Sequence, residues 1–255
     1  MFKEIKSQAK KLLRKNYKTF LPLILLYELF VILDSVAFSI LFEKSLPEQR
    51  YFLIIVCFFA ILLVELVLLP IITVSVYKVG LCVLKNANDI TFKIKQFLTK
   101  SNIFKIAIIN LIPKILVLAS ATIKYSSEFF NNKTIYFILT FFVLFIRCIV
   151  SYKLFISNYY FATNQTSVKE TLKYSANKMK GSFFRYICFG LSFILWDLLI
   201  IAIGVVVSFV CVAINVNYDS IAFLFASGYG LMLYYRPYRF LSEMLFCKEL
   251  EKTKS

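Results

Sequence analysis

Residues 51–77 read YFLIIVCFFAILLVELVLLPIITVSVY. This stretch contains a single charged residue, Glu65, in a run longer than the ~20 apolar residues that a helix needs to cross a bilayer. Inside a bilayer, each backbone N–H and C=O must find its partner within the protein, and a helix supplies these partners itself. The stretch therefore predicts a membrane-spanning helix with one acid inside it.

The composition of the whole chain supports the same interpretation. Of its 255 residues, 60% are hydrophobic and 17% are charged, whereas soluble domains average ~45–50% apolar and ~25% charged residues. A globular core of this size could not bury so much apolar surface, so lipid must cover part of it. We expect a single membrane domain over residues 1–255.

The length criterion predicts six spans, and the fold class is therefore all-α: a polytopic transmembrane helical bundle. The expected spans are residues 20–42, 51–77, 103–123, 134–152, 183–213 and 220–246. The fifth is too long for one upright helix. Its first residues are expected to lie in the membrane interface, or the helix is expected to bend at Gly204.

The distribution of basic residues predicts the orientation of the spans. With the N-terminus in the cytoplasm, 24 of the 30 Lys and Arg residues fall in cytoplasmic segments and 4 fall in outside loops. We expect a multi-pass protein of the cell membrane with both termini cytoplasmic. The formal net charge of +16 then suits anionic lipid headgroups rather than nucleic acid, for which the sequence shows no motif.

Two cytoplasmic stretches have the pattern of amphipathic helices. In the leader, residues 1–19, apolar residues share one face of a helix over 2–15 and lysines take the other, with Lys10, Lys11 and Lys15 expected to point toward lipid headgroups. A second such helix is expected within residues 166–184, where Ser167 and Glu170 have the spacing of a capping box. Each is interpreted as an interfacial helix, or as a docking surface for a partner.

The basic residues at the edges of the spans, Lys105, Arg185, Arg236 and Arg239, are counted with the cytoplasmic segments. Six charged residues lie deeper in the predicted spans, and they are the candidate sites. They are Glu28, Asp34, Glu65, Lys114, Arg147 and Asp197. A charge at the centre of a span costs roughly 2.5–3.5 kcal/mol on insertion scales, so such residues usually face the bundle interior. The charges are interpreted as structural pairs or, alternatively, as a path for an ion or proton. We expect Glu65 and Asp197 to face the interior, and Glu65 to approach Lys114 or Arg147.

The residue types exclude several chemistries. The chain contains no histidine, which removes the Ser-His-Asp triad, His-ligated metals and the usual proton relay near neutral pH. None of its six cysteines forms a CxxC pair, so they are interpreted as small buried hydrophobes. We expect no enzyme activity, no metal site and no cofactor.

Two stretches carry a resemblance to a known family. Residues 173–199 read KYSANKMKGSFFRYICFGLSFILWDLL, and residues 236–250 read RPYRFLSEMLFCKEL. With a glycine after the second span, they resemble the bacterial membrane family called domain of unknown function 975. The positions that carry the resemblance are Gly80, Gly181, Leu191, Ser192, Phe193, Trp196, Pro237, Tyr238, Phe246, Glu249 and Leu250.

The chain departs from that pattern at Leu195, Ser242 and Cys247, where the family has Gly, Thr and Tyr. The resemblance implies a six-helix bacterial membrane protein and supplies no catalytic residues. The function expected from the sequence is a non-enzymatic interaction with a membrane protein or membrane-active peptide, in an accessory, regulatory or immunity role. The alternative is a small permease or exporter that uses the intramembrane carboxylates. The sequence does not define an oligomeric state.

Overall fold

The computed structural model describes residues 1–41, 51–85, 90–125, 133–213 and 221–252, and within these ranges the protein is helical and contains no strand. The helices are α1 (Phe2–Ser39), α2 (Tyr51–Leu63), the π-helical turn η2 (Val64–Leu68), α3 (Leu69–Leu84), α4 (Ile90–Phe97), α5 (Lys100–Tyr125), α6 (Lys133–Lys153), α7 (Ser157–Asn164), α8 (Val168–Met179), α9 (Phe183–Leu191), α10 (Ile194–Ala213) and α11 (Ile221–Lys252). The all-α fold class is confirmed.

The described part of the chain contains four stretches that are long and apolar enough to cross a membrane. They are Phe2–Asp34, Tyr51–Leu84, Phe137–Asn164 and Phe183–Ile200. The two other predicted spans, 103–123 and 220–246, fall on α5 and α11, which are 26 and 32 residues long. Some side chains of these two helices lie outside the described residues, so six spans stay a prediction.

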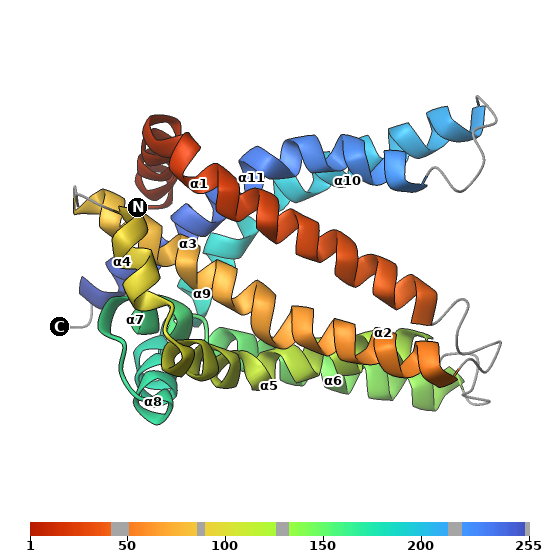
Figure 1. The fold of residues 1–255 in the computed structure, drawn as a ribbon, viewed down its shortest axis with the longest axis horizontal. Coiled ribbons are helices and arrows are strands. Elements are labelled where there is room, and N and C mark those ends of the chain that lie inside the picture. The colour runs from red at the N-terminus through yellow and green to blue at the C-terminus, as the bar shows by residue number, and fades with distance from the viewer. Residues whose placement is uncertain (42–50, 86–89, 126–132, 214–220, 253–255) are drawn as a thin grey trace.

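The long helices run side by side, and the short helices gather at one end of the bundle. α1 packs against α11 and α3, α5 packs against α6, and α10 packs against α11. Figure 1 shows α4, α7 and α8 at the same end as the start of α1 and the end of α11. The chain thus begins and finishes its helical path on one side of the bundle.

The leader forms the first part of α1, which kinks at Asn16 with φ −125° and ψ 21°. The amide of Asn16 donates a hydrogen bond to the carbonyl oxygen of Leu12 at 3.1 Å, and such a side-chain bond competes with the helical backbone pattern. The predicted apolar face is present, since Ile5, Ala9 and Leu13 are buried.

That apolar face is covered by protein. The ring of Phe2 lies against those of Phe189 and Phe246, and the ammonium of Lys6 donates to the carbonyl oxygen of Ser192. The expectation that the leader lays this face on the lipid surface is therefore corrected, because α9 and α11 provide the apolar surface instead. Lys10, Lys11 and Lys15 remain exposed, as a headgroup contact would require.

A π-helical turn separates α2 from α3, and Pro70 explains it. Proline has no N–H, and its ring would clash with the carbonyl four residues earlier in a regular helix. Pro70 occupies the first turn of α3, directly after the wider turn of η2. A π-turn relieves this conflict without ending the helix, and it places Glu65 within the widened turn.

The long fifth span is divided, as expected, but not at Gly204. α9 ends at Leu191 and α10 begins at Ile194, while α10 continues through Gly204. The Ser192 hydroxyl donates to the carbonyl oxygen of Phe189 at 2.6 Å and thereby partners a carbonyl at the end of α9. The break between the two helices therefore lies at Ser192 and Phe193, before Gly204 in the sequence.

The second amphipathic helix is α8, and its predicted N-terminal cap is present. The backbone N–H of Glu170 donates to the Ser167 hydroxyl at 3.3 Å. After the helix, Gly181 has a backbone φ of +74°, a conformation that residues with a Cβ rarely adopt. Met179, on the apolar face of α8, is fully buried, so α8 also packs on protein.

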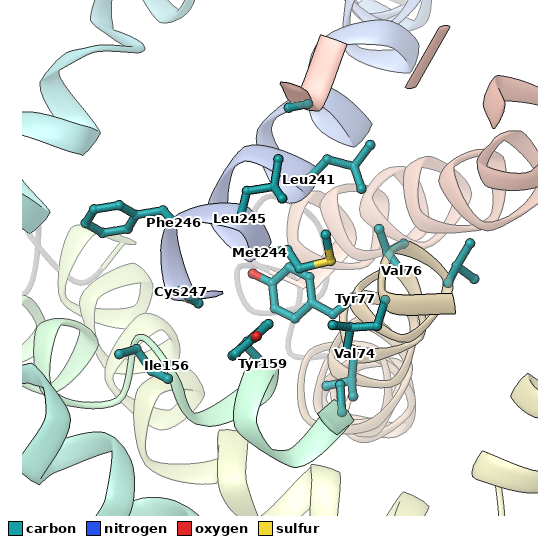
Figure 2. Packing of buried hydrophobic residues seen from close by; sticks show 14 of the residues in the cluster. Val74, Val76, Tyr77, Ile156, Tyr159, Leu241, Met244, Leu245, Phe246 and Cys247 are labelled. Atoms are coloured by element: carbon teal, nitrogen blue, oxygen red, sulfur yellow. The ribbon is translucent and has the colours of Figure 1, made fainter. Parts of the chain in front are cut away.

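The core lies where α3, α7 and α11 meet. Figure 2 shows Met244 of α11 beside Tyr77 of α3, with Tyr159 of α7 below them. Gly80 allows this close approach, because a Cβ at that position would lie 2.6 Å from Sδ of Met244. The glycine expected after the second span is therefore a packing contact between α3 and α11.

Candidate intramembrane charge sites

Glu65 forms an ion pair with Lys114, which joins the π-turn η2 to α5. Glu65 is buried, and about a quarter of the Lys114 side chain is exposed. The prediction that Glu65 faces the interior and approaches Lys114 or Arg147 is confirmed, with Lys114 as the partner. The opposite charges offset part of the cost of burying each other.

Asp34 of α1 is buried beside this pair. Its charge interacts with those of Glu65 and Lys114, and its Oδ1 has no hydrogen-bond partner among the described residues. Two acids therefore share one base. A buried carboxylate without a full partner is costly, so Asp34 is the least satisfied member of the cluster, which we call the inner cluster: Asp34, Glu65 and Lys114.

Glu28 of α1 pairs with Arg236, one of the basic residues at the cytoplasmic edge of the sixth predicted span. Nε of Arg236 on α11 lies 2.7 Å from Oε1 of Glu28. The guanidinium of Arg236 also lies 4.9 Å from the ring centroid of Tyr27, which adds a cation–π contact. The geometry at Glu28 is that of an ion pair without a well-aligned hydrogen bond.

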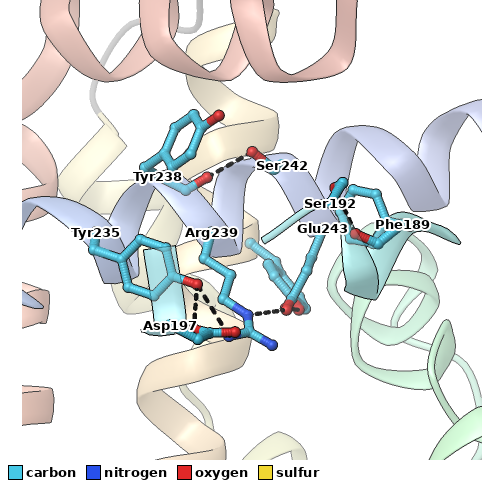
Figure 3. Close-up of polar contacts among 9 residues, drawn as sticks. Phe189, Ser192, Asp197, Tyr235, Tyr238, Arg239, Ser242 and Glu243 are labelled. Carbon is cyan, nitrogen blue, oxygen red and sulfur yellow. Dashed lines mark hydrogen bonds and ion pairs between the residues drawn. The ribbon is translucent and has the colours of Figure 1, made fainter. Parts of the chain in front are cut away.

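Asp197 belongs to a second group of polar side chains, the α10–α11 cluster, which Figure 3 shows in part. Its Oδ1 accepts a hydrogen bond from the Tyr235 hydroxyl at 2.5 Å and lies 3.2 Å from Nη1 of Arg239. Nε of Arg239 lies 3.3 Å from Oε1 of Glu243, and the other oxygen of Glu243 accepts from the Tyr77 hydroxyl at 3.0 Å. The cluster links α10, α11 and α3.

The expectation that Asp197 faces the interior is corrected in part. Its side chain is 41% exposed, and that of Arg239 is 40% exposed. α10 contacts α11, and Asp197 is satisfied by α11 from one side only. Trp196 beside it is likewise 40% exposed, and its ring stacks on Tyr235 at 6.0 Å between centroids.

Arg147 is the one candidate that the structure leaves apart from the acids. It lies half-buried on α6, and among the described residues it forms no ion pair. Apolar side chains on the same helix are exposed, including Phe141, Phe142 and Phe145. α6 therefore has an exposed apolar face. The partner of Glu65 is Lys114 and not Arg147.

The candidates include four acids but only two bases, Lys114 and Arg147, and α11 supplies further bases to two of the acids. Arg236 and Arg239 supply the partners of Glu28 and Asp197. Both arginines flank Pro237 in α11, which continues as one helix to Lys252. The sequence would have indicated these bases if the sixth helix had been expected to continue beyond its apolar stretch. In a continuous helix, the spacing of Arg236 and Arg239 places them next to each other on one face.

The motif positions have structural roles in this fold. Pro237 is buried within α11, and Tyr238 packs on Phe193 with its ring centroid 5.9 Å away. The Tyr238 carbonyl oxygen accepts a hydrogen bond from the Ser242 hydroxyl at 2.8 Å. Together with Gly80 and Gly181, these positions set helix packing and a turn.

The described residues offer no group of three or more His, Cys, Asp or Glu side chains placed to hold a metal ion. Cys57, Cys82 and Cys247 are buried free thiols, in agreement with their interpretation as small hydrophobes, whereas Cys148 and Cys188 are exposed. What the charged groups do here is hold helices together: α1 to α11, η2 to α5, and α10 to α11.

A helical bundle with long apolar helices and paired charges between them defines the class of a helical membrane protein. The chain belongs to the family described as Protein of unknown function (DUF975), whose sequence profile matches residues 1–254. The resemblance seen in the sequence is thereby confirmed over almost the entire chain. Neither a curated protein nor a solved structure matches it.

Proposed function

We propose that the protein crosses the cell membrane six times with both termini in the cytoplasm. The start of α1 and the end of α11 lie at the same end of the bundle, which suits an even number of crossings. The short helices α4, α7 and α8 lie at that end too, and they carry the exposed Lys93 and Lys169. The excess of basic residues favours the cytoplasm for this face.

Cysteine labelling in intact cells tests the topology. In a variant without native cysteines, Lys93→Cys and Lys169→Cys should resist an impermeant thiol reagent until the cells are opened. Tyr51→Cys, at the exposed start of α2, should react from outside. Labelling of position 93 or 169 in intact cells would refute the assignment.

We further propose that the protein acts without catalysis, through contact with a membrane protein or a membrane-active peptide in an accessory, regulatory or immunity role. The observation that carries this is the pairing of Glu28, Glu65 and Asp197 with bases on other helices. Because these ion pairs hold helices together, they support a stable bundle, and a stable bundle can present its surface to a partner. Anionic lipid headgroups are the expected contact of its basic face.

A charge swap separates this proposal from transport. Glu65→Gln should lower the thermal stability of the purified protein, and exchanging the charges as Glu65→Lys with Lys114→Glu should restore part of it. Crosslinking in native membranes should then recover the same specific membrane partner with the wild type and the swapped variant. Glu65→Gln alone could lose the partner simply because the protein unfolds. The stability measurement on the same variant identifies this case.

The second candidate, a permease or exporter, rests on Asp34. Its incompletely satisfied carboxyl beside the Glu65–Lys114 pair is the one feature that a purely structural cluster does not need. Proteoliposomes with an internal pH dye test it directly. A proton flux that is abolished by Asp34→Asn, while the protein keeps its stability, would favour the permease.

A further inference from the structure

A cavity of about 500 Å³ opens where the end of α3 meets α4 and the end of α7. Lys78, Lys85 and Lys93 line it, together with Thr163, Gln165 and the apolar ring of Phe97. This volume lies within the range of small-molecule pockets, ~300–1,000 Å³. The cavity belongs to neither the inner cluster nor the α10–α11 cluster, so the proposed function leaves it unassigned.

The described residues that line the cavity carry three positive charges and no negative one. Among the described residues that line it, none is acidic, and the charges of Lys85 and Lys93 both act unfavourably on that of Lys78. Three ammonium groups around one cavity repel one another unless an anion joins them. The electrostatics of the cavity therefore favour a negatively charged occupant.

Lys78 is fixed in the wall rather than free in solvent. Its ammonium donates to the carbonyl oxygen of Ala162 at 2.9 Å and lies 5.2 Å from the ring centroid of Phe97. An ammonium has three N–H donors, and the carbonyl uses one of them. Lys78 thus keeps donor capacity for a second partner, while Lys85 and Lys93 are exposed.

Gln165 adds an oriented donor. Asn102 donates to the carbonyl oxygen of Phe97 at 2.8 Å and to Oε1 of Gln165 at 3.3 Å. Because Oε1 of Gln165 is occupied as an acceptor, its NH₂ group is the part left to bind another molecule. Gln165 is also the one described non-glycine residue with positive φ, 53°, a conformation that often marks a constrained position.

We propose that this cavity binds a phosphate group, presented either by the headgroup of an anionic membrane lipid or by a soluble phosphate ester. The side chains that carry the argument are donors or cations, and phosphate offers several strong acceptor oxygens to them. The cavity lies where an apolar helix of the bundle ends, and basic pockets between helices at such a boundary suit lipid headgroups. Leu81 and Phe97 add apolar atoms to the lining, which the organic part of either ligand can contact.

The test uses the full chain purified in detergent, with two probes. Native mass spectrometry measures retention of phosphatidylglycerol against phosphatidylcholine, and isothermal titration measures binding of inorganic phosphate. The test variant is Lys85→Gln with Lys93→Gln, since both lysines are exposed and their removal should spare the fold. The matched control is Lys3→Gln with Lys18→Gln, which removes the same charge from two exposed positions of α1 that are not among the lysines expected at lipid headgroups.

The test variant should bind the favoured probe about tenfold more weakly than the wild type, whereas the control should change by less than about twofold. Lysine-dependent retention of phosphatidylglycerol identifies a lipid as the source, and lysine-dependent binding of inorganic phosphate alone identifies a soluble ester. The proposal is overturned if neither probe binds, or if the control lowers binding as much as the test variant. Gln165→Glu, which replaces the donor by a carboxylate, should abolish binding in either case.

Discussion

Nε of Arg236 on α11 lies 2.7 Å from Oε1 of Glu28 on α1, so an ion pair joins the first long helix to the last. The carboxylate is almost fully buried, with 5% of its side chain exposed. These two helices also share extensive packing contact. The pair therefore closes the bundle between the two ends of the chain.

Removing the base should leave Glu28 as an uncompensated buried charge. We expect Arg236→Gln to lower the free energy of unfolding by about 3 kcal/mol, measured by thermal unfolding in detergent. The double variant Glu28→Gln with Arg236→Gln should recover most of this loss, because neither charge remains. Lys252→Gln, which removes an exposed partner of Glu249, is the control and should change stability by less than about 1 kcal/mol. Equal losses in the single and double variants would contradict a paired charge.

The Glu65–Lys114 pair could be predicted from the sequence, whereas the pair at Glu28 could not. Glu65 lies in the second predicted span and Lys114 in the third, and short loops bring consecutive spans together. Glu28 and Arg236 are more than 200 positions apart, so only the tertiary packing of α1 on α11 brings them together. Arg236 is also counted with the cytoplasmic residues at the edge of the sixth span, and so the sequence does not indicate it as a partner for an intramembrane acid.

The sequence likewise predicted which segments are helical better than it predicted where the helices end and what packs against their apolar faces. Apolar runs of span length decide where a helix forms, because the bilayer leaves no other choice for the backbone. Whether protein or lipid covers an amphipathic face depends on distant residues, and for the leader these are Phe189 and Phe246. In the sequence, Lys78, Lys85 and Lys93 resemble the other basic residues near the ends of helices, and only the fold brings them to one cavity with Gln165.

Gly80 should tolerate no side chain while Met244 occupies its present place. A Cβ there would lie 2.6 Å from Sδ and 3.1 Å from Cε of Met244, and 3.0 Å from Cδ2 of Leu241. We expect Gly80→Ala to cost about 1–3 kcal/mol of stability through overpacking. Met244→Ala should cost less in the Gly80→Ala background than in the wild type, and thermal unfolding of the four proteins measures this coupling. Gly190→Ala is the control, since nothing lies within 4 Å of its added Cβ.

Tyr174 of α8 should titrate at unusually high pH. Burial, followed by the charge of Glu251, raises the pKa of its phenol from 10.0 to about 12, and its hydroxyl lies 3.3 Å from Oε1 of Glu251. Below pH 10 the phenol is protonated in both the folded and unfolded states, so its stabilising contribution is complete. As the pH rises from 10 toward 12, the unfolded state loses its proton first and this contribution is lost.

The phenolate absorbance of the wild type minus that of Tyr174→Phe measures this titration. The difference should have its midpoint near pH 12, and the stability of the wild type should fall more steeply above pH 10 than that of the variant. A midpoint near the ordinary value of 10 would show that the Tyr174 hydroxyl does not contact the Glu251 carboxylate.

The leader should be docked on protein even without lipid. The ring centroid of Phe2 lies 6.2 Å from that of Phe189 and 6.0 Å from that of Phe246, and these two rings stack on each other at 4.3 Å. A photoreactive benzoylphenylalanine at Phe2 should therefore crosslink within the chain to peptides of α9 or α11, in detergent as well as in liposomes.

The same photoreactive residue at Lys11, which is exposed on the opposite face, should give no intramolecular crosslink to α9 or α11. Lipid docking predicts the reverse pattern at Phe2: crosslinks to lipid acyl chains in liposomes and none to α9 or α11 in detergent. Phe2→Ala should loosen the leader without unfolding the bundle, because Ile5, Ala9 and Leu13 remain buried behind it. Its expected signature is faster thiol labelling at Leu13→Cys in the Phe2→Ala background than in the parent, with labelling at Lys11→Cys unchanged.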